Sequence, residues 1–259
     1  WVRCRVDGRA ASQAVVTAIA LGEDGRKHFC GADVLDTESY GDWSAFLANL
    51  RSRGMEGVQL VVSDAHGGLK RAIAERFQGA SWQRCTVHLL RDVRGHVHNR
   101  ADAARASELA KAVFEQRDPL VARAVLRLAA EEIERFSRPA AECLSSAQED
   151  CLAYMDFPAA HWQKIRTNNI QERANREIKR RARVVQSFPS RASLVRLVGA
   201  VLAEEEDAWA QRRVFSPESA RRAWSERRRP VPTELELKTA ERRARDVVAQ
   251  ALDRAAARA

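Results

Sequence analysis

Three features are missing from this sequence, and each absence excludes a class of protein. No apolar run approaches the roughly 18 residues of a membrane span, since residues 14–21 are too few and residues 192–203 include Arg196. No charged segment followed by an apolar stretch and small residues opens the chain, so a secretory signal peptide is not expected. The five cysteines are odd in number and scattered, unlike a secreted disulfide framework. We therefore expect a cytoplasmic protein with no membrane partner.

Positive charge is what the chain has in excess. It carries 44 Lys and Arg residues against 35 Asp and Glu residues, a formal net charge of +9. Its 45% hydrophobic and 31% charged residues are typical of a folded globular chain. The 259 residues fit one or two domains at about 150 residues each. The charge favours a polyanionic partner, most often nucleic acid.

The first third alternates between strand and helix patterns. Residues 1–6 alternate, and the Asp7-Gly8 dipeptide that follows is preferred in two-residue hairpin turns. Strands expected over 12–21 and 26–34 would complete an antiparallel meander. Periodicity and apolar content then predict a helix over 39–53, a buried strand over 58–62, a helix over 69–77 and a strand over 80–85. This order predicts an α/β layer fold with a mixed sheet.

Strand patterns nearly disappear after Val87. Spacings rich in Ala, Leu, Arg and Glu predict helices over 103–114, 119–136, 140–155, 169–183 and 191–212. The Ser187-Phe188-Pro189-Ser190 segment separates the last two helices. Residues 218–232 are basic and predicted to be irregular, with the run Arg227-Arg228-Arg229-Pro230, and residues 233–259 have few large apolar side chains. The C-terminal segment is expected to be a peripheral helix or a partly disordered tail.

Asp64 directly follows the expected buried strand and precedes Ala65-His66-Gly67-Gly68 and a helix. Open α/β sheets place reactive groups at the carboxyl ends of their central strands. A carboxylate there can bind Mg²⁺, which prefers oxygen ligands. Capping of the following helix is the other role that suits an aspartate at this position. Position alone leaves both interpretations open.

Cys85 and His88 form a Cys-x-x-His pair at an expected strand-to-helix junction. A structural zinc site needs four ligands, usually from two such pairs. His96 and His98 have a different spacing and no partnering cysteine. We therefore expect no zinc here, and a half-buried Cys and His at the junction is the simpler interpretation.

A basic segment with two acidic residues runs from Ile170 to Arg183. At helical spacing, Glu172 shares one face with Arg176, Lys179 and Arg183. Such a carboxylate suits a metal ligand held beside phosphates gripped by cations, whereas a surface helix with balanced charges is the alternative. The candidate DNA-binding residues are Asn168, Arg173, Asn175, Arg176, Lys179, Arg180, Arg181 and Arg183.

Taken together, these segments resemble the Mutator-type bacterial transposases of the insertion-sequence-256 family. The matching strings are residues 61–70, residues 79–88 and residues 168–181 continuing to Phe188-Pro189. The Asp7-Gly8-Arg9 hairpin, Trp209 and residues 216–219 also resemble that family. The likeness covers the chain from Trp1 to about Ser219.

The resemblance implies a ribonuclease-H-like core with an Asp-Asp-Glu metal triad. It places the second Asp at Asp64 and the Glu at Glu172, 108 residues apart. It also associates Cys85 and His88 with the active site without a zinc finger. The implied organisation is a first part of the catalytic core over 1–91, an all-helical insertion over 92–165, core helices over 166–215 and a basic helical or partly disordered tail over 216–259.

The family's first Asp would precede the position matched by Trp1. The chain starts without Met in an alternating pattern, so we expect natural sequence upstream. The main hypothesis is an insertion-element transposase that cuts and joins DNA phosphodiesters with magnesium or manganese, at element terminal repeats and in target DNA. It would act as a homo-oligomer on the bacterial nucleoid. The alternative is a catalytically dead remnant that binds DNA or oligomerises with full-length transposase.

Overall fold

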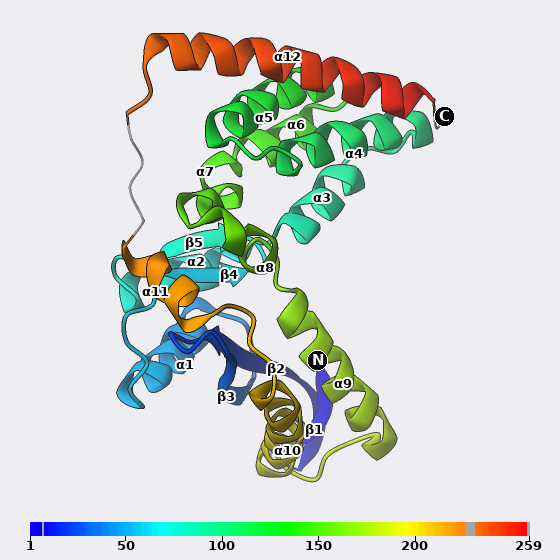
Figure 1. The fold of residues 1–259 in the computed structure, drawn as a ribbon. Coiled ribbons are helices and arrows are strands. Elements are labelled where there is room, and N and C mark those ends of the chain that lie inside the picture. The colour runs from blue at the N-terminus through cyan, green and yellow to red at the C-terminus, as the bar shows by residue number, and fades with distance from the viewer. Residues whose placement is uncertain (7, 226–230, 258–259) are drawn as a thin grey trace. The chain divides into compact units, whose positions relative to one another are not determined.

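The computed structural model describes residues 1–6, 8–225 and 231–257. It divides into two compact units, which are described separately (Figure 1). The first unit contains residues 1–61, 66–80 and 168–225, and the second contains residues 62–65, 81–167 and the C-terminal segment from 226. Asp7 of the expected hairpin turn and residues 226–230 of the expected irregular stretch lie outside the described residues. The irregular structure expected for residues 218–225 is wrong, because they belong to the helix α11 (Pro217–Ser225).

An antiparallel meander forms the sheet of the first unit. Strand β1 (Val2–Val6) pairs with β2 (Arg9–Leu21), and β2 pairs with β3 (Lys27–Leu35). The β1–β2 register brings Val6 opposite Arg9, so only two residues connect these strands, as predicted. The turn before β3 needs a glycine, because Gly25 has a φ of 76° and a Cβ there would meet the Phe215 carbonyl.

Five helices complete the part of the first unit that the structure describes. They are α1 (Tyr40–Ser52), α2 (Gly67–Arg76), α9 (Asn169–Ala182), α10 (Arg191–Ala210) and α11 (Pro217–Ser225), with a short 3₁₀ turn, η3 (Arg183–Val185), after α9. A capping box between Ser39 and Asp42 starts α1. Ile178 of α9 and Leu194 and Val198 of α10 share one buried core with Cys4 and Val34 of the meander. Helices α9 and α10 thus cover the meander with their apolar faces.

The expected single mixed sheet is wrong, because the strands of the described residues form two separate sheets. Strands β4 (Leu60–Ser63) and β5 (Ser81–Arg84) pair with each other, and the meander is a sheet of its own. Each of these two strands has only four residues, so they offer few ladder hydrogen bonds to a further strand. The fold is therefore mixed α/β and mostly helical, with two small sheets.

Helices build most of the second unit. They are α3 (Thr86–Gly95), α4 (Arg100–Phe114), α5 (Pro119–Glu134), α6 (Arg138–Ser145), α7 (Gln148–Cys151) and α8 (Trp162–Ile165), with 3₁₀ turns η1 (Ala153–Asp156) and η2 (Ala159–His161). Residues 92–162 are all described and contain no strand, as predicted. Leu109, Leu126, Ile133 and Leu144 lie in one fully buried core.

The continuous helix expected over 140–155 is wrong, because the chain breaks there into α6, α7 and η1. The buried side chain of Gln83 explains the second break, between α7 and η1. Its Nε2 donates to the Cys151 carbonyl at 2.9 Å, and its Oε1 accepts from the Tyr154 N–H at 2.8 Å. A continuous helix would use both backbone groups internally, so the contacts with β5 replace helical hydrogen bonds.

The C-terminal segment, for which a peripheral helix or a partly disordered tail was expected, forms the long helix α12 (Glu234–Ala256). It packs against α4 and α5 in the same core through Ala240, Ala244, Val248 and Ala251, and Ala255 is also buried. These small residues recur at spacings of four and three, which large-residue periodicity does not reveal. Two ion pairs join it to the same helices, Glu241 to Arg127 and Arg254 to Glu108. No helix among the described residues is long and apolar enough to cross a membrane.

Candidate functional site

The pairing of β4 with β5 brings Asp64 and Cys85 together. Each residue directly follows the last residue of its strand. The Cys85 N–H donates to the Ser63 carbonyl at 2.8 Å, and the Trp82 indole N–H donates to Ser63 Oγ at 2.8 Å. The two strand ends are therefore tied together by backbone and side-chain hydrogen bonds.

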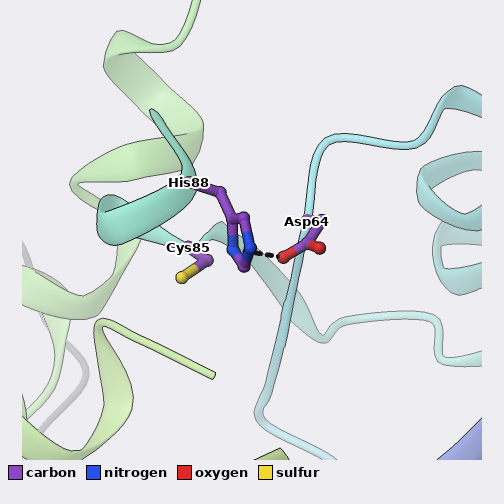
Figure 2. A group of neighbouring side chains, drawn as sticks. All are labelled: Asp64, Cys85 and His88. Atoms are coloured by element: carbon purple, nitrogen blue, oxygen red, sulfur yellow. Dashed lines mark ion pairs between the residues drawn. The ribbon is translucent and has the colours of Figure 1, made fainter. Parts of the chain in front are cut away.

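His88 reaches the same point from the first turn of α3. Cys85 occupies the N-cap position of this helix, and the Thr86 N–H donates to the Arg166 carbonyl at 3.1 Å. Leu89, one residue further, is fully buried and fixes the rotation of the helix. His88 Nδ1 lies 2.6 Å from Asp64 Oδ1, and Figure 2 shows the imidazole facing the carboxylate.

The three side chains differ in their access to solvent. The Asp64 side chain is 55% exposed, the His88 side chain is 19% exposed and Cys85 is fully buried. The Asp64 carboxylate is thus accessible to a substrate or a metal ion, while the less exposed His88 imidazole contacts it from the protein side. The buried Cys85 thiol is not placed to attack a substrate.

The donor set allows the fit of a metal ion to be tested. In the part of the chain that the structure describes, Asp64, Cys85 and His88 form the one group of three candidate ligands, with donor atoms within 4.8 Å of one another. Two ligand atoms on one tetrahedral zinc ion, with bonds of roughly 2.0–2.1 Å, lie about 3.4 Å apart. The separation of 2.6 Å between Asp64 Oδ1 and His88 Nδ1 is shorter than this spacing, because the carboxylate and the imidazole contact each other directly. The arrangement fits a carboxylate that is oriented by an imidazole and exposed enough to meet a hard cation.

The capping interpretation of Asp64 is wrong, because His66 fills that role. His66 is the N-cap of α2, and its Nδ1 accepts from the Leu69 N–H at 3.2 Å. Histidine is not among the preferred N-cap residues, so sequence reasoning did not single it out. Asp64 therefore lies at the strand end without serving the helix that follows.

Glu172 lies in the first turn of α9, within the first unit. The Glu172 N–H donates to the carbonyl of Asn168, which is the N-cap residue of α9. Ala174, Ile178 and Ala182 are the buried residues of this helix. Since Asp64 belongs to the second unit, its convergence with Glu172 stays a prediction.

The predicted DNA-binding residues of α9 fall into two groups. Arg173, Arg176, Lys179 and Arg183 are exposed, and among the described residues none of them forms an ion pair; we call these four the cationic face. Arg180 and Arg181 instead bind Glu177, and Arg181 also binds Glu204 of α10 at 2.5 Å. These bonds from Arg180 and Arg181 lower the pKa of Glu177 to about 2.

Asn175 is held inside the first unit by polar contacts that sequence analysis did not anticipate. Its Oδ1 accepts from Gln171 Nε2 at 3.3 Å and from the Thr17 hydroxyl of β2 at 3.4 Å. These contacts join α9 to the meander beside the buried residues of the helix. The spacing of Gln171 and Asn175 by four residues is the signal that could have indicated a polar pair on one face.

The structure thus defines a mixed α/β protein that presents an imidazole-supported carboxylate at a strand end and, in its other unit, a helix with an exposed cationic face. A family model described as "Transposase, Mutator family" matches residues 1–212. The chain belongs to this family of transposases.

Several curated transposases are similar in sequence. The transposase for insertion sequence element IS406 of Burkholderia multivorans is 35% identical over 217 residues, covering 83% of this chain and 55% of the relative. That of IS1081 from Mycobacterium tuberculosis is 36% identical over 83% of this chain and 51% of the relative. That of IS256 in transposon Tn4001 from Staphylococcus aureus is 34% identical over 81% and 54%. The chain spans about half the length of these relatives.

Proposed function

We propose that this chain carries part of the catalytic centre of an insertion-element transposase, which cuts and joins DNA phosphodiesters through an Asp-Asp-Glu metal site on a ribonuclease-H-like core. Asp64 and Glu172 are two of the three carboxylates. Membership of the Mutator family supports the reaction class. The exposed Asp64 carboxylate at the end of β4, oriented by His88, is the observation that carries the assignment.

Asp64, Glu172 and His88 have different roles in the proposed reaction. Two bound metal ions would activate the attacking oxygen and stabilise the leaving oxygen of a phosphodiester. Asp64 and Glu172 supply hard oxygen ligands of the kind that Mg²⁺ and Mn²⁺ prefer. His88 keeps the Asp64 carboxylate in one orientation through their 2.6 Å contact. Substitution of His88 should therefore weaken metal binding without removing a ligand.

The cationic face of α9 would bind the DNA backbone. Arg173, Arg176, Lys179 and Arg183 need not break ion pairs to contact phosphates, because they form none among the described residues. Each phosphate contact changes the slope of log affinity against log salt by about 0.9. Four contacts thus predict a steep salt dependence, for element terminal repeats and for target DNA alike. The active assembly is proposed to contain more than one copy of the protein.

Cleavage of a terminal-repeat duplex in Mg²⁺ or Mn²⁺ tests this proposal. The resemblance assigns the family's first Asp to a position ahead of Trp1. The assay therefore compares the chain as given with a form that is extended at its N-terminus and carries this Asp. We expect cleavage by the extended form, and losses of roughly 10²-fold or more in rate for Asp64→Asn and Glu172→Gln. Asp246→Asn and Asp207→Asn replace exposed carboxylates of α12 and α10 and should leave the rate unchanged.

The outcomes separate the proposal from its alternative. If the chain as given cleaves DNA at full rate, the triad has been assigned to the wrong residues. If the extended form also fails to cleave DNA but still binds it, the protein is a DNA-binding remnant rather than an active transposase. Activity that survives Asp64→Asn would overturn the role of the strand-end carboxylate.

A further inference from the structure

Two neighbouring valines are exposed where α9 ends. Val184 is 84% exposed and Val185 is 42% exposed, both within the 3₁₀ turn η3. We call this pair the valine tip. Exposed apolar side chains that adjoin each other in this way often mark a surface that contacts a partner.

The backbone beside the valine tip is strained. Gln186 has a φ of 56° and a ψ of −57°, and among the described residues it is the one non-glycine residue with a positive φ. The Ser187 N–H donates to the Val185 carbonyl at 2.6 Å, which closes a γ-turn of the rare, strained form around Gln186. Strain of this kind persists only where the surrounding structure enforces it, and it is concentrated at functional sites.

Both sides of the turn are anchored in the first unit. Ile178 and Ala182 of α9 are buried before it, and Phe188 is 4% exposed after it. The Phe188 N–H donates to the Arg3 carbonyl at 3.0 Å, and the Phe188 carbonyl accepts from the Arg5 N–H at 2.9 Å. Strand β1 therefore holds the chain directly after the turn, so the two valines are presented to solvent by a fixed frame.

The charge around the valine tip indicates the chemistry of its partner. Arg183 of the cationic face precedes Val184 directly, and Lys179 lies one helical turn earlier. Glu177, the nearest acidic residue of α9, is engaged by Arg180 and Arg181. A partner that satisfies both features must carry negative charge and also expose an apolar surface. Duplex DNA does so when a base step opens, because proteins insert apolar side chains between bases while cations hold the phosphates.

We propose that the valine tip is a wedge that enters an opened base step of duplex DNA while the cationic face holds the adjacent phosphates. The inference rests on the proposed function as a DNA-acting protein and adds how the DNA is distorted. A wedge must unstack a base step to enter a relaxed duplex, at a cost of a few kcal/mol per step. DNA that is already unstacked should therefore bind more tightly.

Binding to two duplexes tests the wedge. One duplex is fully paired, the other carries a two-nucleotide bulge, and both are labelled with 2-aminopurine beside the step. We expect the wild-type chain to prefer the bulged duplex by about tenfold or more and to raise 2-aminopurine fluorescence in the paired one. The double variant Val184→Thr with Val185→Thr keeps the side-chain shape and adds hydroxyls. It should lose both the preference and the fluorescence change while keeping the salt slope.

Two control variants isolate the effect. Val231→Thr alters a valine that is 92% exposed outside the tip and should behave as wild type. Arg176→Gln with Lys179→Gln should weaken binding to both duplexes equally and lower the salt slope by about 2. This pattern separates phosphate contacts from contacts with the bases.

The remaining outcomes decide between a DNA wedge and a protein contact at the valine tip. An unchanged preference in the valine double variant overturns the wedge and leaves the proposed function intact. A change in oligomeric state of that variant, measured by light scattering with DNA binding unaltered, shows that the tip contacts protein instead. If the wild-type chain binds neither duplex, DNA binding itself is refuted.

Discussion

Replacement of Gln83 by methionine should strongly destabilise the second unit. Gln83 is fully buried, and its amide bridges the Cys151 carbonyl and the Tyr154 N–H at 2.9 and 2.8 Å. Methionine has a similar length but satisfies neither group. A buried backbone group without a partner costs about 1–3 kcal/mol, so losing both contacts should lower the free energy of unfolding by about 2–6 kcal/mol. That is a large share of a typical total of about 5–15 kcal/mol.

Urea unfolding followed by circular dichroism measures this loss. The control Gln250→Met changes an exposed glutamine of α12 and should stay within about 0.5 kcal/mol of wild type. If Gln83→Met does not fold, Gln83→Glu keeps an acceptor for the Tyr154 N–H and should be intermediate in stability. Faster hydrogen exchange at the Tyr154 amide should accompany the loss. A wild-type midpoint in Gln83→Met would show that the break between α7 and η1 does not depend on this bridge.

Three further perturbations have defined outcomes. Hydrogen bonds from Arg180 and Arg181 lower the pKa of Glu177 from 4.5 to about 2, so its stabilising effect is complete above about pH 4.5 and is lost as the pH falls toward 2. The stability difference between wild type and Glu177→Gln in urea titrations should shrink over that range, and a constant difference would contradict the ion pairs. His66→Ala removes the N-cap acceptor of α2 and should lower the free energy of unfolding by about 0.5–2 kcal/mol, measured by thermal melts. His66→Ser should restore most of this loss. Equal melting temperatures of all three proteins would refute the cap. Burial raises the pKa of Cys151 to about 12, and Cys4 and Cys85 are also fully buried. Brief alkylation of the folded chain, followed by peptide mass spectrometry, should modify Cys30 and Cys143 first, because these two are only partly buried. Early labelling of Cys151 would show that its burial is wrong.

Local patterns were enough to predict most of the secondary structure. The alternation before the Asp7-Gly8 turn and the strand composition over 12–21 predicted the β1–β2 hairpin, and the apolar spacing over 39–53 predicted α1. These elements depend on residues close in sequence, whose side-chain period and turn chemistry decide the conformation. Helices α4, α5, α9 and α10 were predicted for the same reason.

The errors arose where distant residues compete with local preference. The segment 140–155 has the composition of one helix, yet Gln83 of β5 takes two of its backbone groups. A helix was one of the two structures expected for the C-terminal segment, but its packing was not expected, because the small buried residues of α12 form a core only together with α4 and α5. The single sheet expected from the sequence is two sheets in the structure, because β4 pairs with β5 and not with a strand of the meander.

The candidate site shows the same division. By itself the sequence indicated which side chains are candidates for the proposed chemistry, since Asp64 follows an apolar strand, Cys85 and His88 share one turn, and cations line one face of α9. Only the tertiary structure decided that His88 supports the Asp64 carboxylate at 2.6 Å, because that contact needs the β4–β5 pairing and the start of α3 together. It also decided which cations of α9 are engaged, because Arg181 is bound by Glu204 from a helix 23 residues away in sequence. Periodicity places residues on a face, whereas ion pairs between elements depend on packing that no local pattern encodes.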